Sequence, residues 1–368
     1  MSASTMSGVE LGFVEAIDEK WKLLSHYFPS KVGGRPAWLV LNPLPTADDI
    51  RCGICGKPCT FLLQIYAPLD EHERCFHRTI FLFVCRDPHC SKANDSRNVK
   101  AFRCQLGKIN DFYSSEPPDE SCFDSTVSHP KADDHQPLCR VCGCSGPKTC
   151  ARCHRAAYCS KEHQTLDWKT GHKRVCSADP EGGNSTSSSY SVTYLFPEYE
   201  LVMEEEVELG GEEPEKSEAE KMREYKEYLT AFQEKGSLLA DEDASNDLDK
   251  MATATDIDRE FRKFKKRVNL EPNQVLRYQR GCEPLWVSAD HIPSADDLPK
   301  CSCGGERKFE FQVMPQLLYH LKVDDVGASL DWGVLAVYTC SESCQPHNDG
   351  YQQEFVWKQD FSTDTKKT

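Results

Sequence analysis

The chain has 368 residues, enough for two or three domains with cores of their own, and only 39% of them are hydrophobic, which indicates a long solvated segment. The net charge of −15 disfavours nucleic acids and anionic membranes as partners and favours basic ones. No apolar run reaches the about 18 to 20 residues of a membrane span, and the start lacks the features of a signal peptide. We therefore expect no membrane partner and residence in the cytoplasm and nucleus.

The first segment, residues 1–31, is expected to carry a helix that leads into the first domain. Apolar residues recur at helical spacing over residues 14–28, and Pro29 would end the helix. The apolar positions are Ile17, Trp21, Leu24 and Phe28. We expect this helix to pack on its own domain rather than on a partner.

Two distant stretches of the chain share one order of residues. PAWLVLNPLPTADDIRCGICG starts at Pro36, and PLWVSADHIPSADDLPKCSCG starts at Pro284. Phe61 and Gln64 then follow the first stretch at the same offsets at which Phe309 and Gln312 follow the second. Apolar and β-branched runs after both stretches predict strands over residues 60–67, 79–85, 308–315 and 333–340. We read a duplicated β unit, with repeat A over residues 32–112 and repeat B inside a C-terminal domain over residues 256–368.

In each repeat, four of the cysteines form two close pairs, and the unpaired ones are expected to be packing residues. Twenty cysteines in a reducing compartment are better explained by metal than by disulfides, and paired thiolates at this spacing can converge on one zinc ion. Buried reduced thiols are the alternative. In repeat B the first pair is one residue tighter, which we expect to strain a tetrahedral site. The predicted ligands are Cys52, Cys55, Cys85 and Cys90 in repeat A, and Cys301, Cys303, Cys340 and Cys344 in repeat B.

A polar linker over residues 113–137 leads to a small module over residues 138–177. This module has the most specific metal-ligand pattern in the sequence. Its spacing is C-x2-C-x7-C-x2-C-x5-C-x3-H-x8-H-x3-C, which starts at Cys139. Eight ligands make two closed four-coordinate sites, and so short a module cannot build an apolar core of its own. Zinc would supply its folding free energy, on the order of 10–16 kcal/mol for each structural ion.

This spacing resembles that of the MYND zinc finger, whose two sites interleave. The resemblance implies that one ion takes Cys139, Cys142, Cys159 and His163, and that the other takes Cys150, Cys153, His172 and Cys176. His163 stands where most MYND fingers have cysteine, and imidazole also ligates zinc. MYND fingers as a family bind short peptide motifs. A purely structural role and DNA binding through the finger's eight basic residues are the alternatives, but no predicted helix groups those residues with base-reading side chains.

The segment over residues 178–255 is predicted to be flexible and acidic, with a weakly alternating run at residues 194–205 and a solvated helix at KMREYKEYLTAF. It either keeps the protein soluble or contacts a basic client or the finger. Residues 256–267 then predict a short amphipathic helix with a basic face.

Taken together, GFVEAIDEKWKL, FPSKVGGRPAWL, CGICGKP, FEFQVMPQLL and EFVWKQD resemble the programmed cell death protein 2 family over nearly the whole chain. Relatives without the finger share both outer halves. The resemblance implies a chaperone that captures a basic, Arg/Gly-tailed protein of the small ribosomal subunit and supports 40S ribosome biogenesis. It also implies an alternative role as a nuclear regulator of apoptosis and cell proliferation, which binds transcriptional corepressors or DNA through the finger.

The residues rank these roles. A chain of charge −15 suits a basic client and is a poor start for DNA binding, which depends on phosphate neutralisation. We expect no enzyme, because closed zinc sites leave no position for a catalytic water and no nucleophile is paired with a base. The expected fold is mostly β with α additions: two similar zinc-pinned halves form one β-rich domain, into which a small zinc-dependent MYND finger is inserted.

Overall fold

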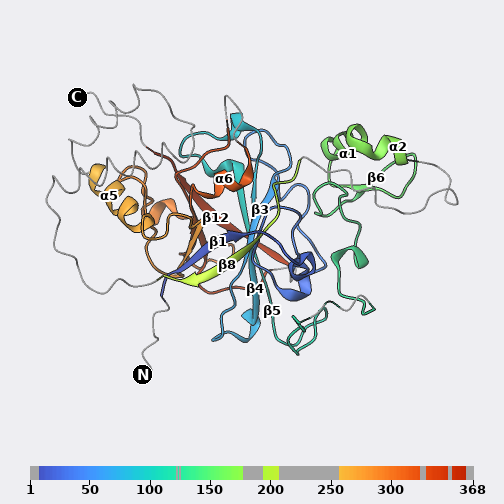
Figure 1. Cartoon of the computed structure of the whole chain (residues 1–368), viewed down its shortest axis with the longest axis horizontal. Coiled ribbons are helices and arrows are strands. Elements are labelled where there is room, and N and C mark those ends of the chain that lie inside the picture. Colours follow the sequence, from blue (N-terminus) through green and yellow to red (C-terminus); the bar gives the residue numbers. More distant parts are fainter. Residues whose placement is uncertain are drawn as a thin grey trace.

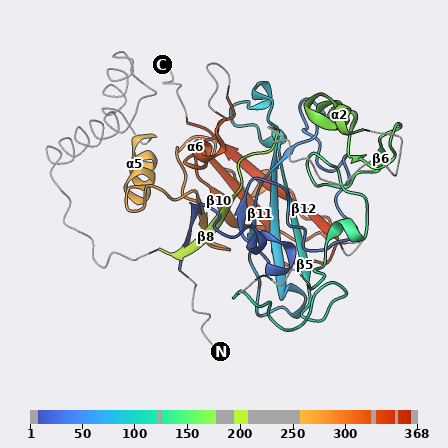
Figure 2. The same cartoon turned by 45° about the vertical axis from the view of Figure 1, so that its right-hand side comes forward.

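The computed structural model describes residues 8–121, 123, 126–176, 194–206, 257–323, 329–346 and 350–361. Over this part of the chain the fold is a closed barrel of ten strands, with the cysteine-rich module beside it. Figure 1 shows this module, with helices α1 and α2, and helix α5 at opposite sides of the barrel, and Figure 2 shows the same arrangement from a second direction. No helix in the described residues is long and apolar enough to cross a membrane.

The barrel is made of two sets of four strands and two strands that join them. Repeat A supplies β2 (Lys31–Val32), β3 (Thr60–Tyr66), β4 (His77–Val84) and β5 (Val99–Leu106). Repeat B supplies β9 (Leu276–Tyr278), β10 (Arg307–Val313), β11 (Val334–Cys340) and β12 (Tyr351–Gln359). The joining strands are β1 (Glu10–Glu15) and β8 (Tyr199–Glu205). The predicted mostly β fold is confirmed.

The two sets meet at both ends through antiparallel pairs. At one seam β5 pairs with β12. At the other, β1 pairs with β8 and with β9 of repeat B, while β8 also pairs with β2 of repeat A. Each joining strand precedes one repeat in the sequence and pairs with the other repeat in space. The barrel therefore closes by an exchange of strands between the two halves.

The two repeats share local details that reveal the duplication. Both have a register shift at the same place in the second strand, after Phe61 and after Phe309. In repeat A the Gln64 amide bonds the N–H and the C=O of Ala37, at 2.8 and 3.2 Å. In repeat B the Gln312 amide bonds the same two groups of Leu285, at 2.6 and 2.9 Å. Each glutamine holds the residue before the repeat's tryptophan, so the predicted duplication of the β unit is confirmed.

Apolar side chains form one interior core and two outer ones. The interior core draws on strands around the whole barrel, as with Leu82 and Val337. On the outside of repeat A, Trp38 packs with Phe81 and Phe83. On the outside of repeat B, Trp286 belongs to a cluster with Phe309, Val334 and Tyr338, and Phe264 and Val268 of α5 (Ile257–Val268) complete it. Trp38 and Trp286 thus occupy corresponding positions on the two halves.

The prediction of a helix over residues 14–28 is wrong. The structure has β1 there, followed by 3-10 turns at Lys20–Leu23 and Ser25–Tyr27. Pairing of β1 with β8 and β9, which are remote in sequence, outweighs the local helical spacing. The run at residues 194–205 does contain a strand, β8, although it lies between two partners rather than at an edge.

The remaining elements are short. The cysteine-rich module has β6 (Lys148–Thr149), β7 (Ala157–Tyr158), α1 (Lys161–Asp167), a π-helical turn at Trp168–His172 and α2 (Lys173–Val175). The predicted helix near residues 256–267 is present as α5, and a further short helix is α6 (Leu317–Leu321). Further 3-10 turns are Glu73–Cys75, Pro88–Cys90, Ser96–Asn98, Ala132–Asp134 and Ala295–Asp297. Most of the predicted acidic segment, including KMREYKEYLTAF, lies outside the described residues.

Candidate metal centres

The structure brings the sixteen predicted ligands together in four groups, and each group has the predicted membership. Within each group the ligand atoms all lie within 4.8 Å of one another. The groups are Cys139, Cys142, Cys159 and His163; Cys150, Cys153, His172 and Cys176; Cys52, Cys55, Cys85 and Cys90; and Cys301, Cys303, Cys340 and Cys344.

The first group of the cysteine-rich module forms where a cysteine knuckle meets the start of α1. Gly143, with φ of 73°, lets the chain turn tightly after Cys142, and its N–H donates to the carbonyl of Cys139. Ser160 caps α1 by accepting from the N–H of His163, which directs the imidazole back toward the cysteines. The Nδ1 atom of His163 lies 3.6 Å from the sulfur of Cys139.

The second group depends on the widened helical turn at Trp168–His172. This turn places His172 and Cys176 opposite the Cys150–Cys153 knuckle. The sulfurs of Cys150 and Cys176 are 3.8 Å apart, and the Nε2 atom of His172 is 3.6 Å from the sulfur of Cys153. The two groups take their ligands alternately along the chain, as the resemblance to a MYND finger implied.

The repeat groups form at equivalent places of the two halves. In each, a cysteine knuckle faces the cysteine that follows or ends the third strand of the repeat, Cys85 after β4 and Cys340 at the end of β11. The sulfurs of Cys55 and Cys85 are 3.7 Å apart, and those of Cys303 and Cys340 are 3.6 Å apart. Although the first pair of repeat B is one residue tighter, its four ligand atoms converge as in the other groups, and Gly304, with φ of 87°, supplies the turn.

These distances fit tetrahedral zinc. With Zn–S bonds of about 2.3 Å and Zn–N bonds of about 2.05 Å, tetrahedral angles separate two sulfurs by about 3.8 Å and a sulfur from a nitrogen by about 3.6 Å. Four soft or borderline ligands at such distances suit zinc and fill its coordination shell. The four groups are therefore consistent with closed structural zinc sites.

The pKa values of the thiols within one repeat group differ widely from one another. In repeat A a hydrogen bond from Cys59 lowers the pKa of Cys52 to about 4, whereas burial raises that of Cys90 to about 12. In repeat B burial opposes ionisation of Cys340, but backbone N–H groups of Cys344 and Glu342 lower its pKa to about 7. Burial raises the pKa of Cys344 to about 12. Adjacent thiolates repel one another, and a divalent cation would let all four ionise.

Five further cysteines in the described part of the chain lie outside these groups. Cys59, Cys75, Cys104 and Cys144 are buried, and Cys282 is half-buried. Cys59 contacts Cys52 from behind the repeat A knuckle but lies outside its group of four. Spacing alone does not separate the two kinds of cysteine, because Cys144 follows Cys142 at the same spacing at which Cys303 follows Cys301.

Sequence reasoning missed a network of buried arginines beside the repeat B group. Arg78 donates to both carboxylate oxygens of Glu310 at 2.7 and 2.9 Å, and Arg280 donates to Glu310 at 2.8 Å. Arg103 and Arg307 both pair with Glu354. All six side chains come from the two repeats, and none is more than 12% exposed.

This network touches the cysteines directly. A guanidinium nitrogen of Arg103 lies 3.6 Å from the sulfur of Cys344, and Arg280 donates to the carbonyl of Cys340 at 3.2 Å. Four guanidinium groups against two carboxylates leave two positive charges in excess. Four thiolates around a divalent cation would carry two negative charges, so a metal in repeat B would balance the network.

The finger packs on repeat A instead of standing apart from it. The indole Nε1 of Trp38 donates to the carbonyl of Gly143 at 2.8 Å, and the buried residues Val141 and Tyr158 join the outer core of repeat A. His163 lies edge-on to the ring of Tyr194, with centroids 4.7 Å apart. Both outer cores are thus covered, repeat A by the finger and repeat B by α5.

Comparison with known proteins assigns the same three parts. Residues 8–120 match the N-terminal domain of programmed cell death protein 2, residues 258–360 match its C-terminal domain, and residues 139–176 match the MYND finger. Programmed cell death protein 2 of Rattus norvegicus is 48% identical over 98% of this chain and 99% of its own length. The Bos taurus protein of that name is 47% identical with the same coverage.

The chain belongs to the programmed cell death protein 2 family.

The chain is also similar, at lower identity, to a yeast protein of a different name. "Probable 20S rRNA accumulation protein 4" of Schizosaccharomyces pombe is 23% identical over 88% of this chain and 91% of its own length. No solved structure matches the chain. Within the family fold, the two matched domains correspond to the two halves of the barrel, and the finger lies between them in the sequence.

Proposed function

We propose that this protein is a zinc-binding adaptor and chaperone, with one zinc ion in each of the four groups. It captures a basic protein of the small ribosomal subunit and so supports 40S ribosome biogenesis. The name of the yeast relative, which refers to accumulation of a ribosomal RNA, supports this role. The zinc ions are structural, no catalysis is involved, and the protein acts in the cytoplasm and nucleus.

The observation that carries the proposal is an acidic ribbon on the joining strands β1 and β8. Their antiparallel register sets Glu10 opposite Glu205 and Glu15 opposite Glu200. Like charges directly opposite one another destabilise a strand pair. Burial, and then the charge of Glu205, raise the pKa of Glu10. Positions five residues apart face opposite sides of a sheet, so the two glutamate pairs lie on different faces, and a basic segment at either pair would relieve its repulsion and favour a cationic client.

The test compares two variants with the same change of charge. In the first, Glu15, Glu200, Glu204 and Glu205 become glutamine; in the second, Glu116 and Glu120 become glutamine and Asp133 and Asp134 become asparagine, all on the exposed linker. Binding of purified basic small-subunit ribosomal proteins is measured at several salt concentrations. We expect the ribbon variant to lose at least about tenfold in affinity and much of the salt dependence, and the linker variant to bind normally. Equal effects of both variants would remove the ribbon from the proposal.

The second candidate function is regulation of apoptosis and cell proliferation in the nucleus, with the finger as the binding module for corepressor peptides. The basic residues Lys161, Lys169 and Lys173 are exposed on the finger, and Trp168 is half-buried beside them. These residues provide a surface for a short acidic or aromatic peptide. If Lys169→Glu with Lys173→Glu abolished a cellular effect on proliferation while client binding stayed intact, this second function would be favoured.

A further inference from the structure

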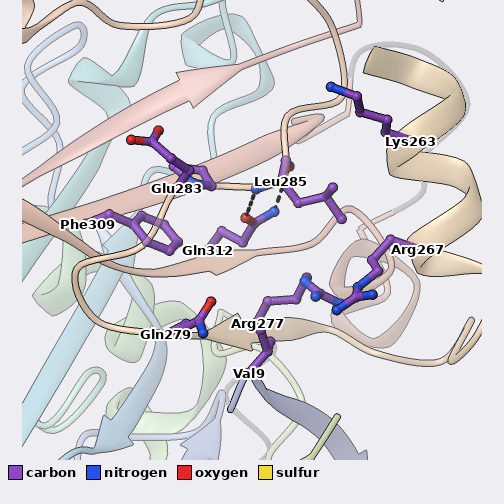
Figure 3. A pocket seen from close by; sticks show the side chains of 10 residues that line it. Val9, Lys263, Arg267, Arg277, Gln279, Glu283, Leu285, Phe309 and Gln312 are labelled. Atoms are coloured by element: carbon purple, nitrogen blue, oxygen red, sulfur yellow. Dashed lines mark hydrogen bonds between the residues drawn. The ribbon is translucent and has the colours of Figure 1, made fainter. Parts of the chain in front are cut away.

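A pocket lies between α5 and the outer face of repeat B (Figure 3). Its volume is about 320 Å³. Leu285 and Phe309 form its apolar part, and Lys263, Arg267 and Arg277 supply three cations. Figure 3 shows the side chains of Arg267 and Arg277 next to one another, whereas the carboxylate of Glu283 points away from them. We call this site the Arg277 pocket.

The duplication identifies the equivalent place in repeat A. Lys31 pairs with Gln64 in the sheet, just as Arg277 pairs with Gln312, and these two glutamines hold Ala37 and Leu285 in the same way. Lys31 in repeat A therefore corresponds to Arg277 in repeat B. Both are buried cations on the first strand of a repeat.

In repeat A this place is filled by the peptide segment Phe196–Pro197–Glu198, which precedes β8. Glu198 forms an ion pair with Lys31. The N–H of Gly34 donates to the carbonyl of Phe196 at 3.0 Å, and the ring of Phe196 is only 2% exposed. Gly33 permits this close approach, since a Cβ there would lie 1.9 Å from the carbonyl oxygen of Pro197. Repeat A thus shows an apolar–x–acidic segment whose carboxylate pairs with the buried cation and whose apolar ring joins the interior core.

Repeat B has the cation and the apolar floor, but its described residues supply no such segment. Val9, which precedes β1, borders the pocket. In repeat A the equivalent position is taken by the residues that precede β8. One carboxylate, Glu206, pairs with both Arg267 and Arg277, at 2.6 and 3.0 Å. Glu206 thus balances one of the two guanidinium groups, and Glu283 lines the pocket but points away from both. Gln279 replaces Gly33, so a ligand would lie farther from the strand and contact this amide.

We propose that the Arg277 pocket binds an acidic peptide of a partner protein, in which an apolar residue stands two positions before a glutamate or aspartate. The apolar side chain packs on Leu285 and Phe309, and the carboxylate meets Arg267 and Arg277. This partner differs in chemistry from the basic client of the proposed function. The pocket also lies on repeat B's outer face, so either assignment can fail without the other.

The probe is a fluorescent peptide with the sequence of residues 194–200, Tyr-Leu-Phe-Pro-Glu-Tyr-Glu, titrated with the full-length zinc-loaded protein and followed by fluorescence anisotropy. We expect saturable binding, weakened at least tenfold by Arg267→Glu in the protein or by Glu198→Gln in the peptide. Lys266→Glu is the matched control, because Lys266 is an exposed cation on the same helix that does not line the pocket. Leu285→Trp, which fills the pocket without a change of charge, should also reduce binding, while zinc content and thermal unfolding stay normal.

Three results would overturn the proposal. Absence of saturable binding would show that the pocket has no peptide affinity. If Arg267→Glu and Lys266→Glu weakened binding equally, or if neither weakened it, the peptide would bind at another site, for example at Lys31. Binding that appears only after deletion of residues 1–7 would assign the pocket to the chain's own N-terminal segment.

Discussion

Replacing Cys303 with serine would test whether the repeat B cysteines hold a metal that the barrel needs. Cys303 is exposed, so the substitution removes a ligand and creates no cavity. Cys282→Ser is the matched control, because Cys282 is half-buried in the same half and belongs to no ligand group. Cys55→Ser removes the equivalent exposed ligand of repeat A.

The expected magnitude follows from the arginine network. A metal in repeat B would balance the two excess positive charges of Arg78, Arg103, Arg280 and Arg307 against Glu310 and Glu354. Losing the partner of a buried charge costs about 3–5 kcal/mol. No comparable buried network is described beside the repeat A cysteines, where Lys57 and Arg97 are exposed. We therefore expect Cys303→Ser to destabilise the barrel by about 3 kcal/mol more than Cys55→Ser does.

The assay combines metal analysis with urea unfolding. The wild-type protein and Cys282→Ser should contain four zinc ions per chain, and Cys303→Ser and Cys55→Ser should contain three. Unfolding free energies should rank the wild type and Cys282→Ser highest, then Cys55→Ser, then Cys303→Ser. Two zinc ions or fewer in the wild type would show that the repeat groups are not metal sites. Equal losses of stability in the two ligand variants would refute the charge-balance argument.

Two further predictions concern contacts that only the structure revealed. Gln64→Leu and Gln312→Leu each leave a peptide N–H and a peptide C=O without a hydrogen-bond partner. In urea titrations each should therefore lower the free energy of unfolding by about 2–4 kcal/mol. Gln353→Leu, at an exposed position of β12, is the control and should have little effect. Trp38→Phe removes the hydrogen bond to the carbonyl of Gly143, which contributes about 1 kcal/mol. This variant should be cleaved faster by protease between the barrel and the finger. An unchanged cleavage rate would mean that the shared apolar core alone holds the finger in place.

The sequence predicted the local features of the fold well. Strands such as β3 and β4 are continuous apolar runs with turn residues at their ends, and their bounds differ by only one or two residues from the prediction. The matching stretches around Trp38 and Trp286 predicted the duplication. A duplication can be recognised from the order of residues along the chain, without knowledge of the three-dimensional structure. The four ligand groups could also be predicted from order along the chain, since metal ligands recur at short, characteristic spacings.

What the sequence could not supply is the pairing of remote residues. Residues 14–28 have helical spacing, but Val14 and Glu15 form the end of β1 because they pair with β8, which is remote in sequence. The partners of Arg78 and Arg103 lie in the other repeat, so no local pattern identifies these arginines as buried. Gln64 and Gln312 could have been noticed as shared polar residues inside apolar strands, but their role requires the neighbouring loop in place.

The exchange of β1 and β8 between the halves has a consequence for synthesis of the protein. Both neighbours of β1 are encoded in the second part of the chain, after the finger. At a translation rate of about 5–20 residues per second, β8 is synthesised about 10 to 40 s after β1. During this interval the nascent N-terminal half exposes unpaired strand edges, which other chains can join. A message truncated before β8 would therefore yield an open, adhesive half-barrel rather than a smaller working protein.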